Sequence, residues 1–146
     1  MLYEKQMLFI AHRGNYNGIN KDRENAPEYV DEALALGYDV ELDLRIINDK
    51  FYLGHDEPQY LVDGEWLMER QEHIWIHCKN LYAFEWAIVN RIAHAFAHDK
   101  DDFTLTTCNK IWTYPGRPVV SCSIIVLFAG DELPKDCYGY CADIKI

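Results

Sequence analysis

The chain repeats one local pattern: a short apolar run that ends in polar or charged side chains. Residues 7–11 lead into His12, and the run at 73–78 is followed by Lys79. Buried strands of a parallel sheet have this character, because both of their faces are covered and their carboxyl ends open into loops. The pattern therefore favours a parallel α/β fold with its polar side chains gathered at one edge of the sheet.

Two segments have the start and stop signals of helices. The first is capped by Asn25 or Ala26, has Pro27 in its first turn and stops at Gly37. The second runs over residues 81–92 and is capped by Asn80. Further short strands are expected at 93–97, 103–106, 119–127 and 138–144. Strands that alternate with helices early and with loops later predict a parallel sheet or barrel with abbreviated connections, in one domain spanning residues 1–146.

Residues 39–45 alternate between charged and apolar side chains. One interpretation is a strand with its charged face in water. The other is a metal site, because Glu41 and Asp43 share a face and repel each other unless a cation lies between them. His77 and Lys79 also share a face, and His77 either adds a ring nitrogen to such a site or is an ordinary hydrogen-bonded histidine.

Two histidines have the spacing expected of an acid/base pair. His12 ends the first strand, and residues 48–54 predict a turn and hairpin that presents His55 at its tip. In phosphodiester cleavage one histidine takes the proton of the attacking hydroxyl and another protonates the leaving alkoxide. Lys79 and a metal would offset the charge of the transition state, and the fork of Arg13 would grip a phosphate oxygen.

Charge and composition limit the partners of the chain. Its formal net charge of −10 opposes binding to nucleic acid, although a small phosphodiester can still bind where a metal offsets the charge locally. The five cysteines are scattered, which argues against a disulfide framework or a zinc ribbon. No leader pattern or membrane-spanning apolar run is visible, so a cytoplasmic location with reduced thiols is expected.

Four short motifs occur in order within the first 60 residues: H-R-G at 12–14, E-N-A-P-E at 24–28, E-L-D at 41–43 and G-H-D at 54–56. Together they resemble the successive motifs of the glycerophosphodiester phosphodiesterases, within the wider superfamily of phospholipase-C-like phosphodiesterases. The strand at 73–79 extends the resemblance less closely. The chain looks like a short form of this family, since a complete (β/α)₈ barrel usually takes about 200 residues or more.

The resemblance implies an α/β fold, an abbreviated TIM-type (β/α) barrel with a reduced number of helices and a site at its C-terminal mouth. It also implies a function for each matching residue: acid/base catalysis for His12 and His55, metal ligation for Glu41 and Asp43, phosphate contact for Arg13, and for Lys79 the place of the lysine in the family's E-x-K strand. The implied cofactor is a divalent metal, with Mg²⁺ or Mn²⁺ favoured.

The chain departs from the family pattern at His77, which stands where a carboxylate ligand is expected. A softer ligand there favours Mn²⁺, Zn²⁺ or Fe²⁺ over Ca²⁺, or it weakens the site. The later part of the chain resembles short bacterial and phage-type relatives. On that basis His98 would reach the mouth of the barrel and Trp112 would wall the substrate pocket. The alternative is that His98 caps a strand in solvent and Trp112 belongs to the core.

These observations predict a metal-dependent phosphodiesterase acting on a glycerophosphodiester or a similar small polar phosphodiester. Two alternatives stay open. The same site can release a cyclic phosphate when a substrate hydroxyl attacks, or the chain is a relative that binds phosphate or metal without turnover. An exposed strand edge in a shortened barrel would also favour pairing with a second copy of the chain.

Overall fold

The computed structural model describes residues 6–146, which form a strand-rich fold with three short helices. The strands are β1 (Leu8–His12), β2 (Asp39–Ile47), β3 (Lys50–Leu53), β4 (Tyr60–Val62), β5 (Ile74–Cys78), β6 (Ala95–Phe96), β7 (Phe103–Leu105), β8 (Ile111–Thr113), β9 (Ser123–Val126) and β10 (Gly139–Ala142). The helices are α1 (Pro27–Ala35), α2 (Gly64–Arg70) and α3 (Leu81–Val89).

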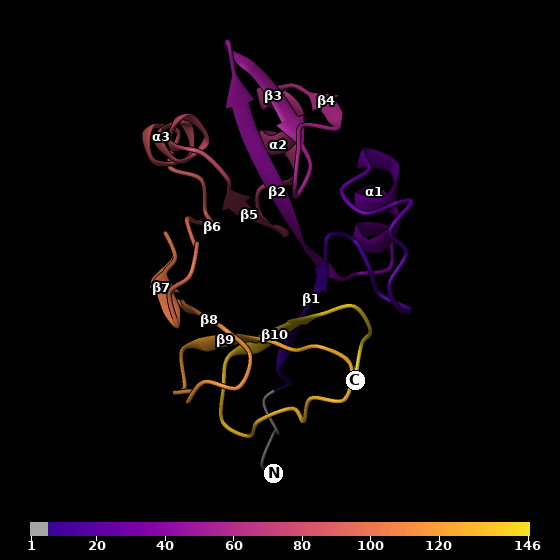
Figure 1. The fold of residues 1–146 in the computed structure, drawn as a ribbon, viewed down its shortest axis with the longest axis vertical. Helices are drawn as coiled ribbons and strands as arrows, with labels where there is room; N and C mark the ends of the chain where they lie inside the picture. Colours follow the sequence, from indigo (N-terminus) through magenta and orange to yellow (C-terminus); the bar gives the residue numbers. More distant parts are fainter. Residues whose placement is uncertain (1–5) are drawn as a thin grey trace.

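All ten of these strands join in one mixed sheet. Its parallel strands are neighbours in the order β6, β5, β2, β1, β10, β9 and β8. Antiparallel strands extend it, with β3 and β4 beyond β2 and β7 beyond β8. Figure 1 shows the sheet curling around an interior, with the helices grouped beside β2 and β5. The carboxyl ends of the parallel strands therefore open on the same side of the curl.

The expectation of an abbreviated TIM-type (β/α) barrel is wrong, since the sheet is a curled, mixed half-barrel and helices do not alternate with its strands. After β6 the connections in the described part of the chain contain no helix. Prolines interrupt two of them, Pro115 and Pro118 between β8 and β9 and Pro134 between β9 and β10. Since proline lacks an amide proton and breaks helix interiors, these segments cross as loops.

The inner face of the curled sheet has an apolar layer and a polar layer. Ile10, Trp75 and Cys141 are buried in an apolar cluster that also holds Phe96, Trp112 and Ile124. Side chains two residues apart on a strand point the same way, so His12 and His77 follow Ile10 and Trp75 onto the same face. The opposite face packs on the helices through a larger cluster containing Leu42, Leu44, Ile76, Val30 and Ala83. The polar side chains therefore lie above an apolar floor.

The charged face of β2 is inside the protein, so the interpretation of a solvated strand face is wrong. Asp39, Glu41 and Asp43 are all buried. The hairpin between β2 and β3 is confirmed, with Asn48 and Asp49 at positive φ in its turn. These two residues occupy the tip.

His55 lies at the other end of β3 from this tip. The Gly54 amide donates to the Asp43 carbonyl at 3.1 Å, which brings His55 back beside the middle of β2.

Most short elements fall close to the expected ranges. Pro27 opens α1 after Ala26, and the Asn80 side chain accepts from the Ala83 amide to cap α3. β4, α2 and β8 were not predicted from the sequence. No helix within residues 6–146 is long and apolar enough to cross a membrane.

Candidate functional site

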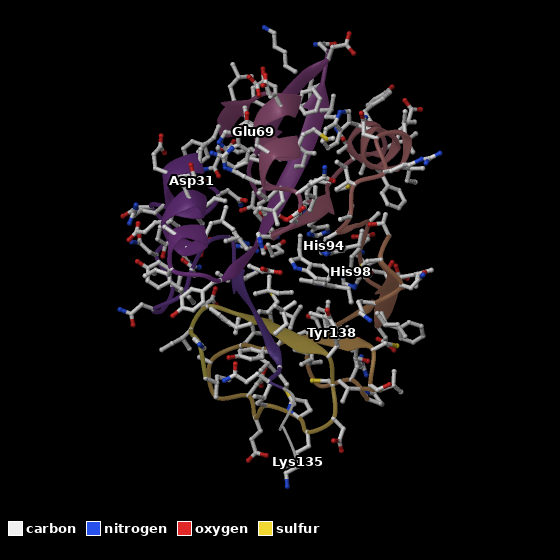
Figure 2. All side chains as sticks on the ribbon, turned by 180° about the vertical axis from the view of Figure 1, so that it is seen from behind. Asp31, Glu69, His94, His98, Lys135 and Tyr138 are labelled. Carbon is white, nitrogen blue, oxygen red and sulfur yellow. The ribbon has the colours of Figure 1, made fainter. Side chains whose placement is uncertain are left out.

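One cavity of about 230 Å³ is lined by every residue that the sequence singled out for chemistry. These residues are His12, Arg13, Glu41, Asp43, His55, His77, Lys79, His98 and Trp112. They come from β1, β2, β5, β8 and the segments that follow β1, β3, β5 and β6. Figure 2 shows His98 beside the interior of the curled sheet, whereas Lys135, in the loop before β10, lies far from this interior. Chain segments distant in sequence thus meet at one polar centre.

Glu41, Asp43 and His77 form the centre of this cavity, and each places a potential ligand atom within 4.8 Å of the others. His77 Nδ1 lies 3.1 Å from Asp43 Oδ1 and 3.8 Å from Glu41 Oε2. Asp43 is fully buried, and its Oδ1 atom has no well-aligned hydrogen-bond donor, although His77 Nδ1 lies 3.1 Å away and its positive charge, when protonated, would offset that of the carboxylate. A buried carboxylate oxygen without a donor is costly unless a cation compensates it. The trio therefore fits a divalent metal.

The second nitrogen of His77 decides which proton form the ring takes. His77 Nε2 lies 3.0 Å from the His98 carbonyl oxygen, which can only accept, so Nε2 carries the proton. In its neutral form the ring would then offer the lone pair of Nδ1 to a cation held between it and the two carboxylates. Metal-binding histidines commonly have this arrangement, in which a backbone carbonyl fixes the tautomer. His77 is thus oriented as a ligand would be, at the position where the sequence resemblance led us to expect a carboxylate.

The pKa values of the two carboxylates are shifted in opposite directions. Burial raises the pKa of Glu41, and the neighbouring Asp43 charge raises it further. Burial acts in the same direction on Asp43, but the contacts with His77 and Asn25 outweigh it and hold the pKa of Asp43 below its usual range. Burial lowers the pKa of His77, and the two carboxylates more than reverse this effect. Without a metal, the centre retains protons that a cation would displace.

Asn25 is a site residue that the sequence reasoning treated only as a helix cap. Its side chain donates to Asp43 Oδ2 at 3.0 Å and accepts from the Asp43 amide at 3.0 Å. It is buried and adopts a φ of 66°, a left-handed conformation that asparagine tolerates better than most residues. Asn25 therefore fixes Asp43 in place from both sides.

Arg13 spans the carboxylates with its backbone and its side chain. Its amide donates to Glu41 Oε1 at 3.1 Å, and its Nη1 atom donates to Glu24 Oε1 at 3.2 Å. The Nε atom lies 3.7 Å from Asp43 Oδ2 but has no hydrogen-bond partner. Its pKa stays above the ordinary value because Glu41 and Asp43 outweigh the effect of burial. Arg13 thus keeps one buried donor for an oxygen of a ligand.

His12 is held by Asp143, which immediately follows β10. The His12 Nδ1 atom lies 2.9 Å from Asp143 Oδ1, and Asn15 Nδ2 donates to the same oxygen at 2.9 Å. Burial lowers the pKa of His12, but Asp143 and Glu41 outweigh it, so that the pKa is raised. Because Nδ1 is engaged by Asp143, Nε2 is the atom that can exchange a proton with a ligand. The role of Asp143 was not anticipated from the sequence.

His55 has the opposite electrostatic character. Burial lowers its pKa more than the Asp43 charge raises it. Its Nδ1 atom lies 2.7 Å from a carboxylate oxygen of the exposed Asp56 and donates to it, which leaves the Nε2 lone pair free. The backbone carbonyl of His55 accepts from Arg45 Nη2, so that a half-buried arginine anchors this segment. His55 and His12, whose pKa values are shifted in opposite directions, thus line the same cavity.

His98 and Trp112 line the cavity wall opposite β2. The His98 carbonyl accepts from His77 Nε2 and so orients that ring. The His98 ring donates from its Nε2 atom to the Asp101 carbonyl oxygen at 2.6 Å. Trp112 is only 5% exposed and stacks on Phe96 at 4.2 Å between ring centroids. Trp112 therefore belongs both to the apolar cluster beneath the polar side chains and to the wall of the cavity.

Basic side chains outnumber carboxylates in the lining of this cavity, which has His12, Arg13, His55, His77, Lys79 and His98 against Glu41, Asp43 and Asp99. Glu24, Glu41, Asp43 and Asp143 are all in contact with Arg13, His12, His77 or Asn15. A larger cavity of about 520 Å³ lies between the β2–β3 hairpin and α3, but its lining has Asp49 and Glu85 and no basic side chain. A phosphate would be repelled there.

Comparison with known proteins adds no assignment. No family model, curated protein or solved structure matches the chain. The chemistry of the site therefore has to be inferred from its own residues.

Proposed function

We propose that the chain is a divalent-metal-dependent phosphodiesterase that hydrolyses a glycerophosphodiester or a similar small diester, as a short form of the glycerophosphodiester phosphodiesterases. The observation that carries the proposal is the buried Asp43 Oδ1 atom, which lacks a well-aligned hydrogen-bond donor and faces the Nδ1 atom of His77. This acceptor cluster lies in the same cavity as two histidines whose pKa values are shifted in opposite directions, His12 upward and His55 downward.

Glu41, Asp43 and His77 would hold the metal. When bound, a divalent cation supplies positive charge that offsets the oxygens of the phosphate and of the transition state. Mn²⁺ and Mg²⁺ are the favoured ions, and Zn²⁺, Fe²⁺ and Ca²⁺ are alternatives. The imidazole ligand favours Mn²⁺ over Mg²⁺, because nitrogen ligands suit first-row transition metals better than hard alkaline-earth ions.

The two histidines divide the proton transfers. His55, neutral and with Nε2 free, takes a proton from the attacking water as the water oxygen bonds to phosphorus. His12, protonated and oriented by Asp143, donates its Nε2 proton to the alcohol oxygen as the bond from phosphorus to that oxygen breaks. Arg13 and Lys79 contact the oxygens of phosphate and oppose the charge that develops on them. A general acid or a general base typically increases the rate of such a reaction by about 10²–10⁴-fold.

Phosphorus NMR tests the proposal. Wild-type protein with Mg²⁺ should convert glycerophosphoethanolamine to glycerol phosphate, and His12→Ala should be at least about 100-fold slower. Phe103→Ala on β7 is the matched control, since this side chain is 65% exposed and does not line the cavity. A cyclic phosphate as the final product would establish the lyase alternative. Equal rates for wild type and His12→Ala across several metals and diesters would exclude catalysis.

A further inference from the structure

The cavity of about 520 Å³ between the β2–β3 hairpin and α3 shares no residue with the catalytic cavity. Ile46 and Phe51, which are paired across β2 and β3, line it from the sheet. Ile46 belongs to the apolar cluster that packs on the helices, so the cavity opens on the helix-covered face of the sheet, beside α3 (Figure 1). Its volume is within the range of about 300–1,000 Å³ that small-molecule sites occupy.

One face of α3 forms the opposite wall of this cavity. The helix residues that line it are Tyr82, Glu85, Trp86 and Val89. The last three follow Tyr82 by three, four and seven positions, so all four lie in one stripe of the helix. Tyr82 and Val89 are 66% and 72% exposed, whereas the core-facing Ala83 and Ala87 are fully buried. The stripe therefore presents apolar surface to the cavity and not to the core.

The floor of the cavity is fixed before any ligand binds. The rings of Phe51 and Trp86 meet edge to face, with their centroids 5.2 Å apart. The Asn80 side chain accepts from the Ile46 amide at 3.3 Å, donates to the Ile46 carbonyl at 3.0 Å and also caps α3. The helix is thus anchored to β2 at a residue of the cavity lining. A ligand would bury apolar surface on this floor without first having to order it.

The polar side chains of the cavity offer unpaired hydrogen-bond acceptors. Asp49 and Glu85 contribute carboxylates, and neither carboxylate has an ion-pair or hydrogen-bond partner within residues 6–146. Asn90 donates from Nδ2 to the Trp86 carbonyl at 2.9 Å, which leaves its Oδ1 atom as a further acceptor. The described lining contains no basic side chain. The cavity therefore attracts a cation, and favours one that carries N–H donors.

We propose that this cavity binds an organic amine, a primary ammonium group carried on an aromatic or branched apolar body. The ammonium group pairs with the carboxylates of Asp49 and Glu85. The apolar body packs on Phe51 and Trp86, whose ring faces also attract the positive charge. An inorganic cation would leave the aromatic floor uncovered, and an organic anion would be repelled. The site is separate from the proposed phosphodiesterase centre and does not depend on its activity.

An NMR titration of the full, isotope-labelled chain tests the proposal with three probes that share a phenyl ring: phenethylamine, phenethyl alcohol and phenylacetate. The indole signals report where a probe binds, because Trp86 lines this cavity and Trp112 lines the catalytic one. We expect the amine to shift the Trp86 signal and to bind at least about fivefold more tightly than the alcohol, because an exposed ion pair and a cation–π contact each strengthen binding by about 2–5-fold. Phenylacetate should leave the Trp86 signal in place.

Three results of this titration would overturn the proposal. They are equal affinities for the amine and the alcohol, an amine that shifts the Trp112 signal and not that of Trp86, and the absence of any shift with millimolar amine. None of them bears on the phosphodiesterase, whose activity is measured separately.

Exposed residues of the cavity allow variants that keep the fold. Asp49→Asn combined with Glu85→Gln should weaken amine binding by at least about fivefold and leave binding of the alcohol unchanged. Tyr82→Ala should weaken both probes, because it removes apolar wall. Glu132→Gln and Phe103→Ala are the matched controls, since both residues are exposed and lie outside the cavity. An amine affinity that is unchanged in the double variant would contradict binding at these carboxylates.

Discussion

Replacing Asp143 by asparagine tests how the site assigns its protons. Asp143 and His12 have side chains that are 14% and 17% exposed, and they are joined at 2.9 Å. A hydrogen bond to a charged group contributes about 1.5–3 kcal/mol, and one pKa unit corresponds to about 1.36 kcal/mol. Loss of the carboxylate charge should therefore lower the pKa of His12 by about 1–2 units.

The sign of the effect on activity follows from the role of His12 as the acid. The enzyme is active while His12 is protonated, so its rate falls as pH rises through the pKa of His12. In Asp143→Asn that alkaline limb should move about 1–2 units toward lower pH. Above the wild-type limb, kcat/KM should be lower than in wild type by about 10–100-fold, because each unit by which the pKa falls lowers the protonated fraction tenfold there.

The assay is a pH–rate profile of kcat/KM at saturating Mn²⁺. Glu132→Gln is the control for the loss of one negative charge, because Glu132 is exposed and lies in the loop before β10. In the His12→Ala background, adding Asp143→Asn should change kcat/KM little further, because the imidazole that Asp143 orients is already absent. An alkaline limb that stays in place in Asp143→Asn would refute the assignment of His12 as the acid.

Three further outcomes are expected. Asn25→Ala should lower the free energy of unfolding by about 2–4 kcal/mol in urea titrations, because it leaves the buried Asp43 without two hydrogen bonds. Gly54→Ala should lower both the free energy of unfolding and the activity, because a Cβ atom there would lie 2.0 Å from the Glu57 carbonyl oxygen. Gly116→Ala should lower only the free energy of unfolding, by about 1 kcal/mol, because no atom lies within 4 Å of a Cβ at that position. In the metal-free protein the pKa values of His12 and His77 are raised, so proton binding to these residues stabilises the folded state. This stabilisation is complete below the unfolded-state pKa of about 6.5 and is lost as pH rises through the folded-state values. The midpoint of thermal unfolding should therefore fall as pH rises above about 6.5. Mn²⁺ should raise that midpoint more at higher pH, because it competes with the proton on His77, and a metal effect independent of pH would count against this ligand.

The site was easier to predict than the fold around it. His12, Glu41, Asp43 and His77 follow from the periodicity of strands, because a residue two positions beyond a buried one faces the same way. Parallel pairing of β1, β2 and β5 then brings them together whatever covers the other face of the sheet. The motif order supplied His55, although its place relative to the hairpin was wrong.

The architecture of the later half of the chain could not be predicted from strand periodicity. Its strands are short, as with β6 and β8, and connections without helices give no periodic signal. β8 was not predicted because Ile111–Thr113 is too brief to alternate, and α2 because its apolar residues are few. Familiar motifs in the first 60 residues favoured a helix-alternating barrel that the rest of the chain does not form.

Three contacts were missed because they join distant segments. Asn25 reads as a helix cap, but the chain turns there through a left-handed conformation and directs the amide to Asp43. Asp143 reads as the end of a strand, and only the parallel pairing of β1 with β10 brings it to His12. Arg45 reads as the last member of an alternating face, but it anchors His55.

The most direct test of the account is the rate of hydrolysis of glycerophosphoethanolamine as a function of Mn²⁺ concentration, in wild type and in Asp43→Asn. The account predicts a saturable dependence on Mn²⁺ in wild type. In Asp43→Asn, half-saturation should require at least about tenfold more metal, because Asp43 supplies both a ligand oxygen and the negative charge that draws the cation. A rate that does not depend on Mn²⁺, or that responds to it identically in the two proteins, would contradict a metal centre at Glu41, Asp43 and His77.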